Sequence, residues 1–220
     1  TRPLFSKLAI HGCLTYSSNI DYLCSMDKFG IYMINQLFFL LLLVSQHVWA
    51  EDDNPKVQIE GFHDSLIQVM QSETDFEGRS SSLRDEVEEL FSLETIARIS
   101  VGRMWRALEQ KQKADFVDLL STLIISTYAD RFTDYQGQKF RTVSAEETSR
   151  GWVVKTEMVR ANKEIVRLDY YFLNGGVFNV VADGVSDLSL RRADYNSIIK
   201  SEGFLALLSH LRQKIDEYSE

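Results

Sequence analysis

The side chains that could bind a metal are few in this 220-residue chain, and they lie far apart. Beyond residue 50 the only histidines are His63 and His210. Zinc enzymes commonly hold their metal with two histidines four residues apart on one helix, and neither histidine has such a neighbour. Both cysteines, Cys13 and Cys24, lie in the first 25 residues. The spacing therefore predicts no metal site in the rest of the chain.

Nucleophilic catalysis would need an activated serine, and one segment begins like such a site. Gly184-Val185-Ser186 matches the first half of the Gly-x-Ser-x-Gly nucleophile elbow, but Leu188 stands where the second glycine is required. A serine between a glycine turn and a helix is more simply an N-cap, whose hydroxyl accepts a hydrogen bond from the first helical turn. We therefore interpret Ser186 as a cap.

Three carboxylates could act as general acid or base, namely Asp169, Asp183 and Asp187. Asp183 is followed by a glycine, which is typical of a turn, and Asp187 suits the first turn of a helix. The adjacent pair Arg191-Arg192 could bind a phosphate, but a solvated helix face is the default interpretation. These residues do not add up to an active site, so binding is favoured over catalysis, and we predict neither enzymatic activity nor a cofactor.

Residues 26–50 have the three parts of a secretory signal peptide. Met26 is followed by Lys28, an apolar run covers 37–44, and Val48-Trp49-Ala50 ends the segment before an acidic stretch. The apolar run is far shorter than the roughly 20 residues that span a bilayer. We expect cleavage after Ala50 and a mature domain over 51–220. Residues 1–25 show no pattern and are interpreted as a non-native or misannotated upstream segment.

The predicted mature chain is acidic and has no cysteine. Loss of residues 1–50 removes three basic and two acidic side chains, which changes the net charge from −8 to −9. Such a charge disfavours binding to nucleic acid and to anionic lipid surfaces. The absence of cysteine excludes disulfides, so the hydrophobic core alone must stabilise the fold.

Four runs predict strands, at 138–145, 152–160, 164–173 and 177–182. Asn174-Gly175-Gly176 between the last two is a strong hairpin signal, because Asn and Gly tolerate the positive φ of a tight turn. In the third run, alternation places Val166, Leu168, Tyr170 and Phe172 on one apolar face. One side of this antiparallel sheet is therefore expected to face the interior.

Helices are predicted on both sides of the strands, at 57–72, 83–91, 93–101, 109–132, 186–200 and 204–218. The 109–132 segment is apolar around most of its circumference, which is typical of a helix buried on several sides. We therefore predict one α+β domain, in which helices precede and follow an antiparallel sheet of about four strands. Periodicity alone leaves open whether its apolar interior is a filled core or a hollow one.

Several stretches, in order, resemble the toluene-tolerance family of MlaC-type periplasmic lipid carriers. They are Phe91-x-x-Glu-x-Ile-Ala-Arg-x-x-Val-Gly-Arg-x-Trp105, Gln112-x-x-x-Asp-Phe116, Leu168-Asp-Tyr170, and the tail from Asp183 to Leu211. The tail is the most specific, and its segment 188–195 is most similar to the hopanoid-associated, HpnM-like branch. Phe178 and 180–182 depart from the Mla branch, which usually has a Trp on the last strand and a Tyr-Asp pair after it.

The resemblance implies an apolar cavity that holds a phospholipid or a hopanoid. It further implies a soluble periplasmic carrier that moves lipid between inner-membrane and outer-membrane transporter complexes, with only transient membrane contact. The residues expected to contact the lipid are Trp105, Phe116, Leu120, Leu123, Ile124, Tyr128, Phe140, Trp152, Val154, Met158, Val166, Leu168, Tyr170, Phe172 and Leu207.

Two alternatives remain. An exported pocket enzyme would use Asp169 or Asp183 with nearby tyrosines, and would have a buried carboxylate facing a polar cavity. An interaction module would have no cavity and a large exposed apolar patch.

Overall fold

The computed structural model describes residues 54–219, and the predicted signal peptide and upstream segment lie outside them. The described chain is α+β, as predicted. Its helices are α2 (Pro55–Gln71), α3 (Phe76–Leu90), α4 (Leu93–Val101), the 3₁₀-helix η1 (Gly102–Ala107), α5 (Gln110–Arg131), α6 (Asp187–Ser201) and α7 (Phe204–Ser219). The strands are β1 (Lys139–Thr148), β2 (Gly151–Val159), β3 (Ile165–Leu173), β4 (Gly176–Ala182) and β5 (Val185–Ser186).

The strands form one antiparallel sheet in the order β1-β2-β3-β4-β5, so each strand pairs with its neighbour in sequence. The predicted hairpin between β3 and β4 is present, with Asn174 and Gly175 at φ 52° and 85°. The sheet has five strands where about four were expected. The extra one is β5, two residues that pair with β4 after a turn in which Asp183 and Gly184 also have positive φ.

Helix boundaries differ from the prediction mainly in α3 and η1. Helix α3 begins at Phe76, seven residues earlier than predicted, because the Asp75 carboxylate caps it by accepting a hydrogen bond from the Gly78 backbone N–H at 2.8 Å. The short helix η1 was not predicted. Gly102, at φ 56°, ends α4 as expected, and the chain continues directly into η1.

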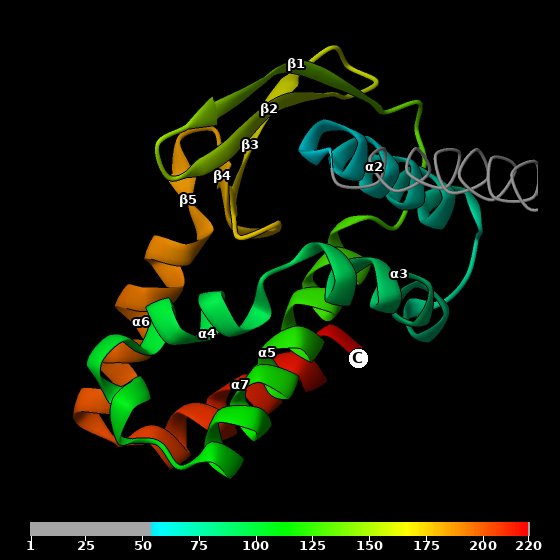
Figure 1. Cartoon of the computed structure of the whole chain (residues 1–220). Coiled ribbons are helices and arrows are strands. Elements are labelled where there is room, and N and C mark those ends of the chain that lie inside the picture. The colour runs from blue at the N-terminus through cyan, green and yellow to red at the C-terminus, as the bar shows by residue number, and fades with distance from the viewer. Residues whose placement is uncertain (1–53, 220) are drawn as a thin grey trace, which may run out of the picture. The chain divides into compact units, whose positions relative to one another are not determined.

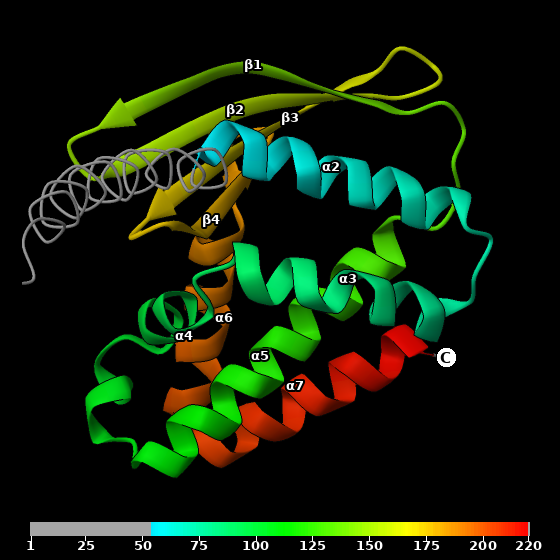
Figure 2. The same ribbon diagram turned by 45° about the vertical axis from the view of Figure 1, so that its right-hand side comes forward.

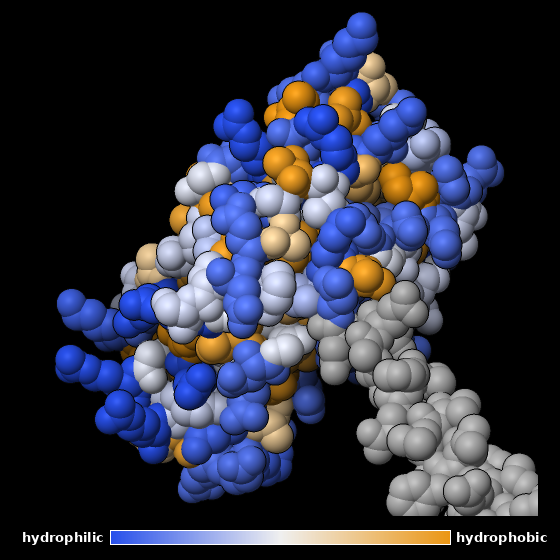
Figure 3. All heavy atoms as spheres, turned by 45° about the horizontal axis from the view of Figure 1, so that its top comes forward, coloured by the Kyte–Doolittle hydropathy of each residue, from blue (hydrophilic) through white to orange (hydrophobic). Residues whose placement is uncertain are grey.

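The helices pack on the sheet and on one another (Figures 1 and 2). Helix α2 runs along the inner face of the sheet and contacts β1 and β2 (Figure 2). Helices α3, α4 and α6 contact β4, and α5 packs against α3, α4 and α7. The outer face of the sheet is covered largely by hydrophilic side chains, with scattered apolar ones (Figure 3). The two faces therefore differ in polarity, as the alternation in β3 predicts.

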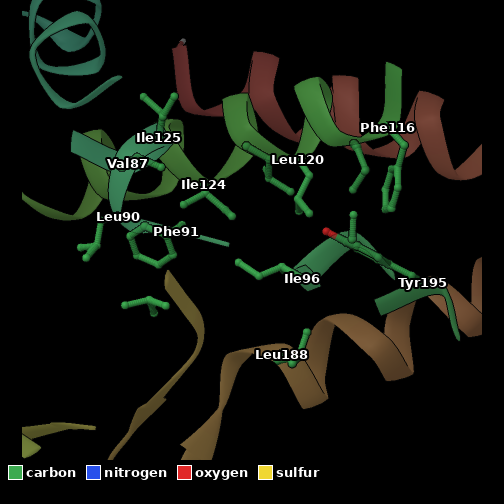
Figure 4. Packing of buried hydrophobic residues seen from close by; sticks show 14 of the residues in the cluster. Val87, Leu90, Phe91, Ile96, Phe116, Leu120, Ile124, Ile125, Leu188 and Tyr195 are labelled. Carbon is green, nitrogen blue, oxygen red and sulfur yellow. The ribbon is translucent and has the colours of Figure 1, made fainter. Parts of the chain in front are cut away.

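Helix α5 is the centre of the helical core. Its residues Phe116, Leu120 and Ile124 are buried and lie among side chains of α3, α4 and α6 (Figure 4). The Phe116 ring makes edge contacts with Tyr195 of α6 and Phe204 of α7, at centroid distances of 6.2 and 5.7 Å. The all-round apolar surface of this segment is thus explained by helices packed on several of its sides.

Strand β1 is an outer strand, since β2 is its sheet partner within the described residues. Its pairing shifts register between Thr142 and Ser144, which marks a β-bulge. Val143 stands at the bulge and is 56% exposed.

Gly151, the first residue of β2, gives a direct test of the sheet geometry. Its φ is 125°, and a Cβ there would lie 2.1 Å from the Phe172 carbonyl oxygen. Gly151→Ala combines this clash with a positive φ, so we expect it to lower the free energy of unfolding by more than about 2 kcal/mol. Gly137→Ala is the matched control, because its φ is 89° and no heavy atom lies within 4 Å of the added Cβ. If urea unfolding showed equal losses of stability in the two variants, the clash with the Phe172 carbonyl would not be the cause of the effect.

Candidate ligand-binding cavity

A cavity of about 870 Å³ lies between the inner face of the sheet and the helices. This volume is within the range of about 300–1,000 Å³ that is typical of small-molecule sites. Most of the lining is apolar. The apolar lining residues are Met70, Phe91, Ile96, Ile124, Tyr128, Phe132, Met158, Ala161, Val166, Leu168, Tyr170, Phe178, Val180, Ala182 and Leu188.

Strand register explains how the sheet supplies its share of this lining. Leu168 pairs with Ala182, and Tyr170 pairs with Val180. Because directly opposed residues of an antiparallel pair point to the same face, β3 and β4 together present these side chains to the cavity. The helices close the other side with residues from α2, α4, α5 and α6.

Polar side chains line the cavity in a few segments. They come from the end of α5 and the loop after it, from the β2–β3 turn, from β4 and from the first two turns of α6. They are Thr127, Arg131, Thr133, Asp134, Gln136, Gln138, Arg160, Asn162, Asn179, Asp187 and Arg191. The site is therefore amphipathic, with an apolar interior and polar groups gathered on a few segments.

A second pocket, of about 550 Å³, adjoins the cavity. Thr127, Arg131, Asp187 and Arg191 line both spaces. Beyond this shared wall the second pocket is formed by Leu123 of α5 and by residues of α6 and α7. It is more polar than the first cavity, with Asp194, His210, Gln213, Lys214 and Glu217 in its lining.

A buried hydrogen bond joins α2 to the cavity wall. His63 Nε2 lies 3.0 Å from the Tyr170 hydroxyl, and the His63 ring stacks on Phe140 at a centroid distance of 4.0 Å. Burial lowers the pKa of His63 to about 4, so the imidazole is neutral at pH 7. Burial, with a smaller contribution from Tyr128, raises the pKa of Tyr170 well above its usual value. His63 is thus part of the wall structure, a role that its isolated position in the sequence does not indicate.

The lowered pKa of His63 predicts acid sensitivity. Unfolded His63 takes up a proton near pH 6.5, whereas the native imidazole does so only near pH 4. Between these values the unfolded state binds more protons, so native stability is full above the upper value and falls as the pH drops towards the lower one. From about pH 7 to about pH 5 we expect a loss of roughly 2 kcal/mol from this residue.

The measurement is urea unfolding of the protein and of His63→Gln at both pH values. The variant should lose less stability on acidification than the native chain. His210→Gln is the matched control, since His210 is exposed and pairs with Glu202 at the surface. If His63→Gln lost as much stability on acidification as the native chain, His63 would not be the cause of the acid sensitivity.

The residues considered for catalysis have structural partners. The Ser186 hydroxyl accepts a hydrogen bond from the Ser189 backbone N–H and donates one to Asn179 Oδ1, so Ser186 is the N-cap of α6 as expected. Asp183 Oδ1 accepts a hydrogen bond from the Arg167 backbone N–H on an exposed turn. The Asp187 carboxylate is half exposed and pairs with Arg191.

Asp169 alternates with the cavity-lining Leu168 and Tyr170, and so lies on the other face of the sheet.

Within residues 54–219 no three potential ligands among His, Cys, Asp and Glu come close enough to hold a metal. The same region contains no helix that is both long and apolar enough to cross a bilayer.

Six of the residues expected to contact a ligand line the cavity, and they are Ile124, Tyr128, Met158, Val166, Leu168 and Tyr170. Leu123 lines the second pocket. Phe140 stacks on His63. The others do not line the cavity: Trp105, Phe116, Leu120, Val154, Phe172 and Leu207 are buried in the hydrophobic core, and Trp152 packs against it.

The position of Phe172 has a clear cause. Although it shares a face with Tyr170 by alternation, the β3–β4 pairing shifts register between Tyr171 and Phe172. At this end of the sheet the link between α3 and α4 packs against β4. Phe91 forms a β-bridge with Val177, and the Ser92 N–H donates a hydrogen bond of 2.8 Å to the Val177 carbonyl. Phe172 therefore packs into solid core.

The sequence did not identify the other apolar lining residues, which are Met70, Phe91, Ile96, Phe132, Ala161, Phe178, Val180, Ala182 and Leu188. Val180 and Ala182 have the right alternation on β4, and extending the hairpin register from β3 would have identified them. Ile96 and Leu188 have no comparable signal, because their positions depend on how α4 and α6 pack against the sheet.

The fold and cavity together define an α+β binding domain. The family model described as "MlaC protein" matches residues 60–213, which is more than half of the chain. The chain therefore belongs to the MlaC family. Comparison with curated proteins found no match.

Among solved structures, the chain is similar to a phospholipid-binding protein from Ralstonia solanacearum, solved in complex with a phospholipid. The TM-score is 0.65 and the identity 16%, and the match covers 76% of this chain and 99% of the other. At this identity the likeness shows a shared fold.

Proposed function

We propose that this protein is a periplasmic lipid-binding carrier. The observation that carries the proposal is the cavity of about 870 Å³ between sheet and helices, with its apolar interior and its polar groups on a few segments. Membership of the MlaC family and the phospholipid held by the structural neighbour support it.

The energetics of lipid transfer explain why such a cavity is needed. Moving apolar surface into water costs about 0.8 kcal/mol per methylene, so a chain of about sixteen carbons costs on the order of 13 kcal/mol. A carrier must replace the contacts that the bilayer provided. Side chains such as Leu168, Met158 and Phe178 supply apolar surface for this purpose, and no catalytic group is required.

The ligand that we propose is a phospholipid or a hopanoid-like lipid. The Ralstonia neighbour supports the first, and the HpnM-like form of residues 188–195 supports the second. The carrier would exchange this lipid between an inner-membrane transporter complex and an outer-membrane complex. The signal peptide predicted at 26–50 supports export to the periplasm.

Lipid extraction from the purified protein tests the proposal. The protein is expressed in a Gram-negative host, purified without detergent and analysed by native mass spectrometry, followed by organic extraction. We expect a bound lipid at a defined stoichiometry. Absence of bound lipid, together with no uptake from vesicles that contain phospholipid and hopanoid, would overturn the proposal.

A further inference from the structure

We propose that Arg191 and Arg131 form a binding site for a phosphate group, at the wall where the apolar cavity meets the second pocket. The proposal deepens the lipid-carrier function, on which it rests for the source of the phosphate. It assigns a recognition role to two side chains that the function so far leaves without one.

Arg191 is a largely enclosed cation with spare hydrogen-bond donors. Its side chain is 13% exposed. Nε donates to Asp187 Oδ2 at 2.6 Å, and Nη1 donates to the Tyr195 hydroxyl at 3.3 Å. A guanidinium has five N–H donors, so three have no protein acceptor within residues 54–219. Enclosed charged donors without acceptors are costly, and phosphate oxygens match the planar fork of arginine.

Arg131 adds a second cation to the same wall. It is the last residue of α5, it lines both spaces, and within the described chain its guanidinium forms no ion pair. The charged side chains of the shared wall are Arg131, Arg191 and Asp187, which leave an excess of one positive charge. The cavity as a whole has the same excess, since its lining adds Arg160 and Asp134. This local charge contrasts with the acidic character of the chain.

The residues next to the two arginines indicate how a bound phospholipid would be oriented. Tyr128 lies nearly one helical turn before Arg131 on α5, and Leu188 lies nearly one turn before Arg191 on α6. Tyr128 and Leu188 both line the apolar cavity. A phosphate held by the arginines would therefore have its acyl chains on the apolar side. The more polar second pocket lies on the other side of the wall and would accommodate the rest of the headgroup.

The test compares two lipids that differ only in the phosphate-bearing headgroup. Delipidated protein is equilibrated with mixed detergent micelles that contain equal amounts of dioleoyl phosphatidylglycerol and dioleoylglycerol, and bound lipid is counted by native mass spectrometry. We expect at least roughly tenfold preference for phosphatidylglycerol, which corresponds to one or two charge-assisted hydrogen bonds. Arg191→Met and Arg131→Gln should each reduce this preference severalfold.

Arg192→Met is the matched control, because Arg192 is the next residue of α6, is exposed and does not line the cavity. It removes the same charge and should leave the preference unchanged. If Arg191→Met fails to fold after losing the partner of Asp187, Arg131→Gln and Arg191→Lys carry the test, since Arg191→Lys keeps the charge but loses the planar fork.

A second arm separates lipid phosphate from free phosphate. The Tm of the delipidated protein is measured in sodium phosphate and in sodium chloride of equal ionic strength. One outcome is a higher Tm in sodium phosphate that Arg131→Gln abolishes, with no preference between the two lipids. This outcome would support the site, with inorganic phosphate as its ligand. Equal binding of both lipids with no effect of phosphate on the Tm would overturn the phosphate site but not the carrier function. A lipid preference that is unchanged in Arg131→Gln would do the same. Failure to bind either lipid would overturn the carrier function.

Discussion

Leu168→Glu is expected to reduce lipid loading by roughly 30-fold or more. Leu168 lies in the middle of β3, lines the cavity and pairs with Thr156 and Ala182. A carboxyl group at this position loses water whenever an acyl chain fills the cavity, and the cost is about 2 kcal/mol even when the group becomes protonated. The empty cavity can hydrate the new side chain, so the domain should remain folded.

Lipid bound per protein, measured by native mass spectrometry after incubation with vesicles, reports this loss. Ile165→Glu is the matched control, since it places the same charge on the same strand at an exposed position on the outer face. Circular dichroism should give similar spectra for both variants. Undiminished loading of a folded Leu168→Glu variant would show that the lipid does not contact this part of the wall.

Phe116→Ala is expected to lower the free energy of unfolding by about 3–5 kcal/mol. The ring is fully buried and packs against Tyr195 and Phe204, so its removal leaves a void between α5, α6 and α7. Lipid loading per folded molecule should not change, because Phe116 does not line the cavity. This outcome would assign Phe116 to the core and correct the expectation that it contacts the ligand.

Urea unfolding followed by circular dichroism gives the stability, and loading is measured below the transition. Leu205→Ala on α7 is the control, since Leu205 is 70% exposed and should change stability by less than about 0.5 kcal/mol. A Phe116→Ala variant that keeps its stability but loses lipid would place the ring in the binding site.

The sheet was largely predictable because its signals are local. Alternation fixes which side of β3 faces inward, and the Asn174-Gly175 turn fixes where the next strand begins. These two facts place Val166, Leu168 and Tyr170 on the inner face. They do not show where the cavity ends, because the boundary at Phe172 depends on the α3–α4 link that packs against β4.

The helical half was predictable in its elements but not in their contacts. The pattern of 109–132 indicates burial on several sides, yet it does not say whether another helix or a ligand covers each side. In the structure, Phe116 and Leu120 contact other helices, whereas Ile124 and Tyr128 line the cavity. The difference arises at the level of tertiary packing, where α6 and α7 cover the first part of α5. Likewise, nothing local links His63 to Tyr170 across 107 residues.

The bulge in β1 has a consequence for the behaviour of this protein at high concentration. An outer strand with free backbone groups is a template on which another chain can add a strand, and this is a common route to aggregation. In β1 the shift between Thr142 and Ser144 interrupts the regular spacing that such addition needs. The strand also carries charged side chains near both ends, Lys139 and Arg141 at one and Glu146 and Glu147 at the other, and charged side chains on an outer strand disfavour the addition of a further strand. Both features oppose growth of the sheet from one molecule to the next.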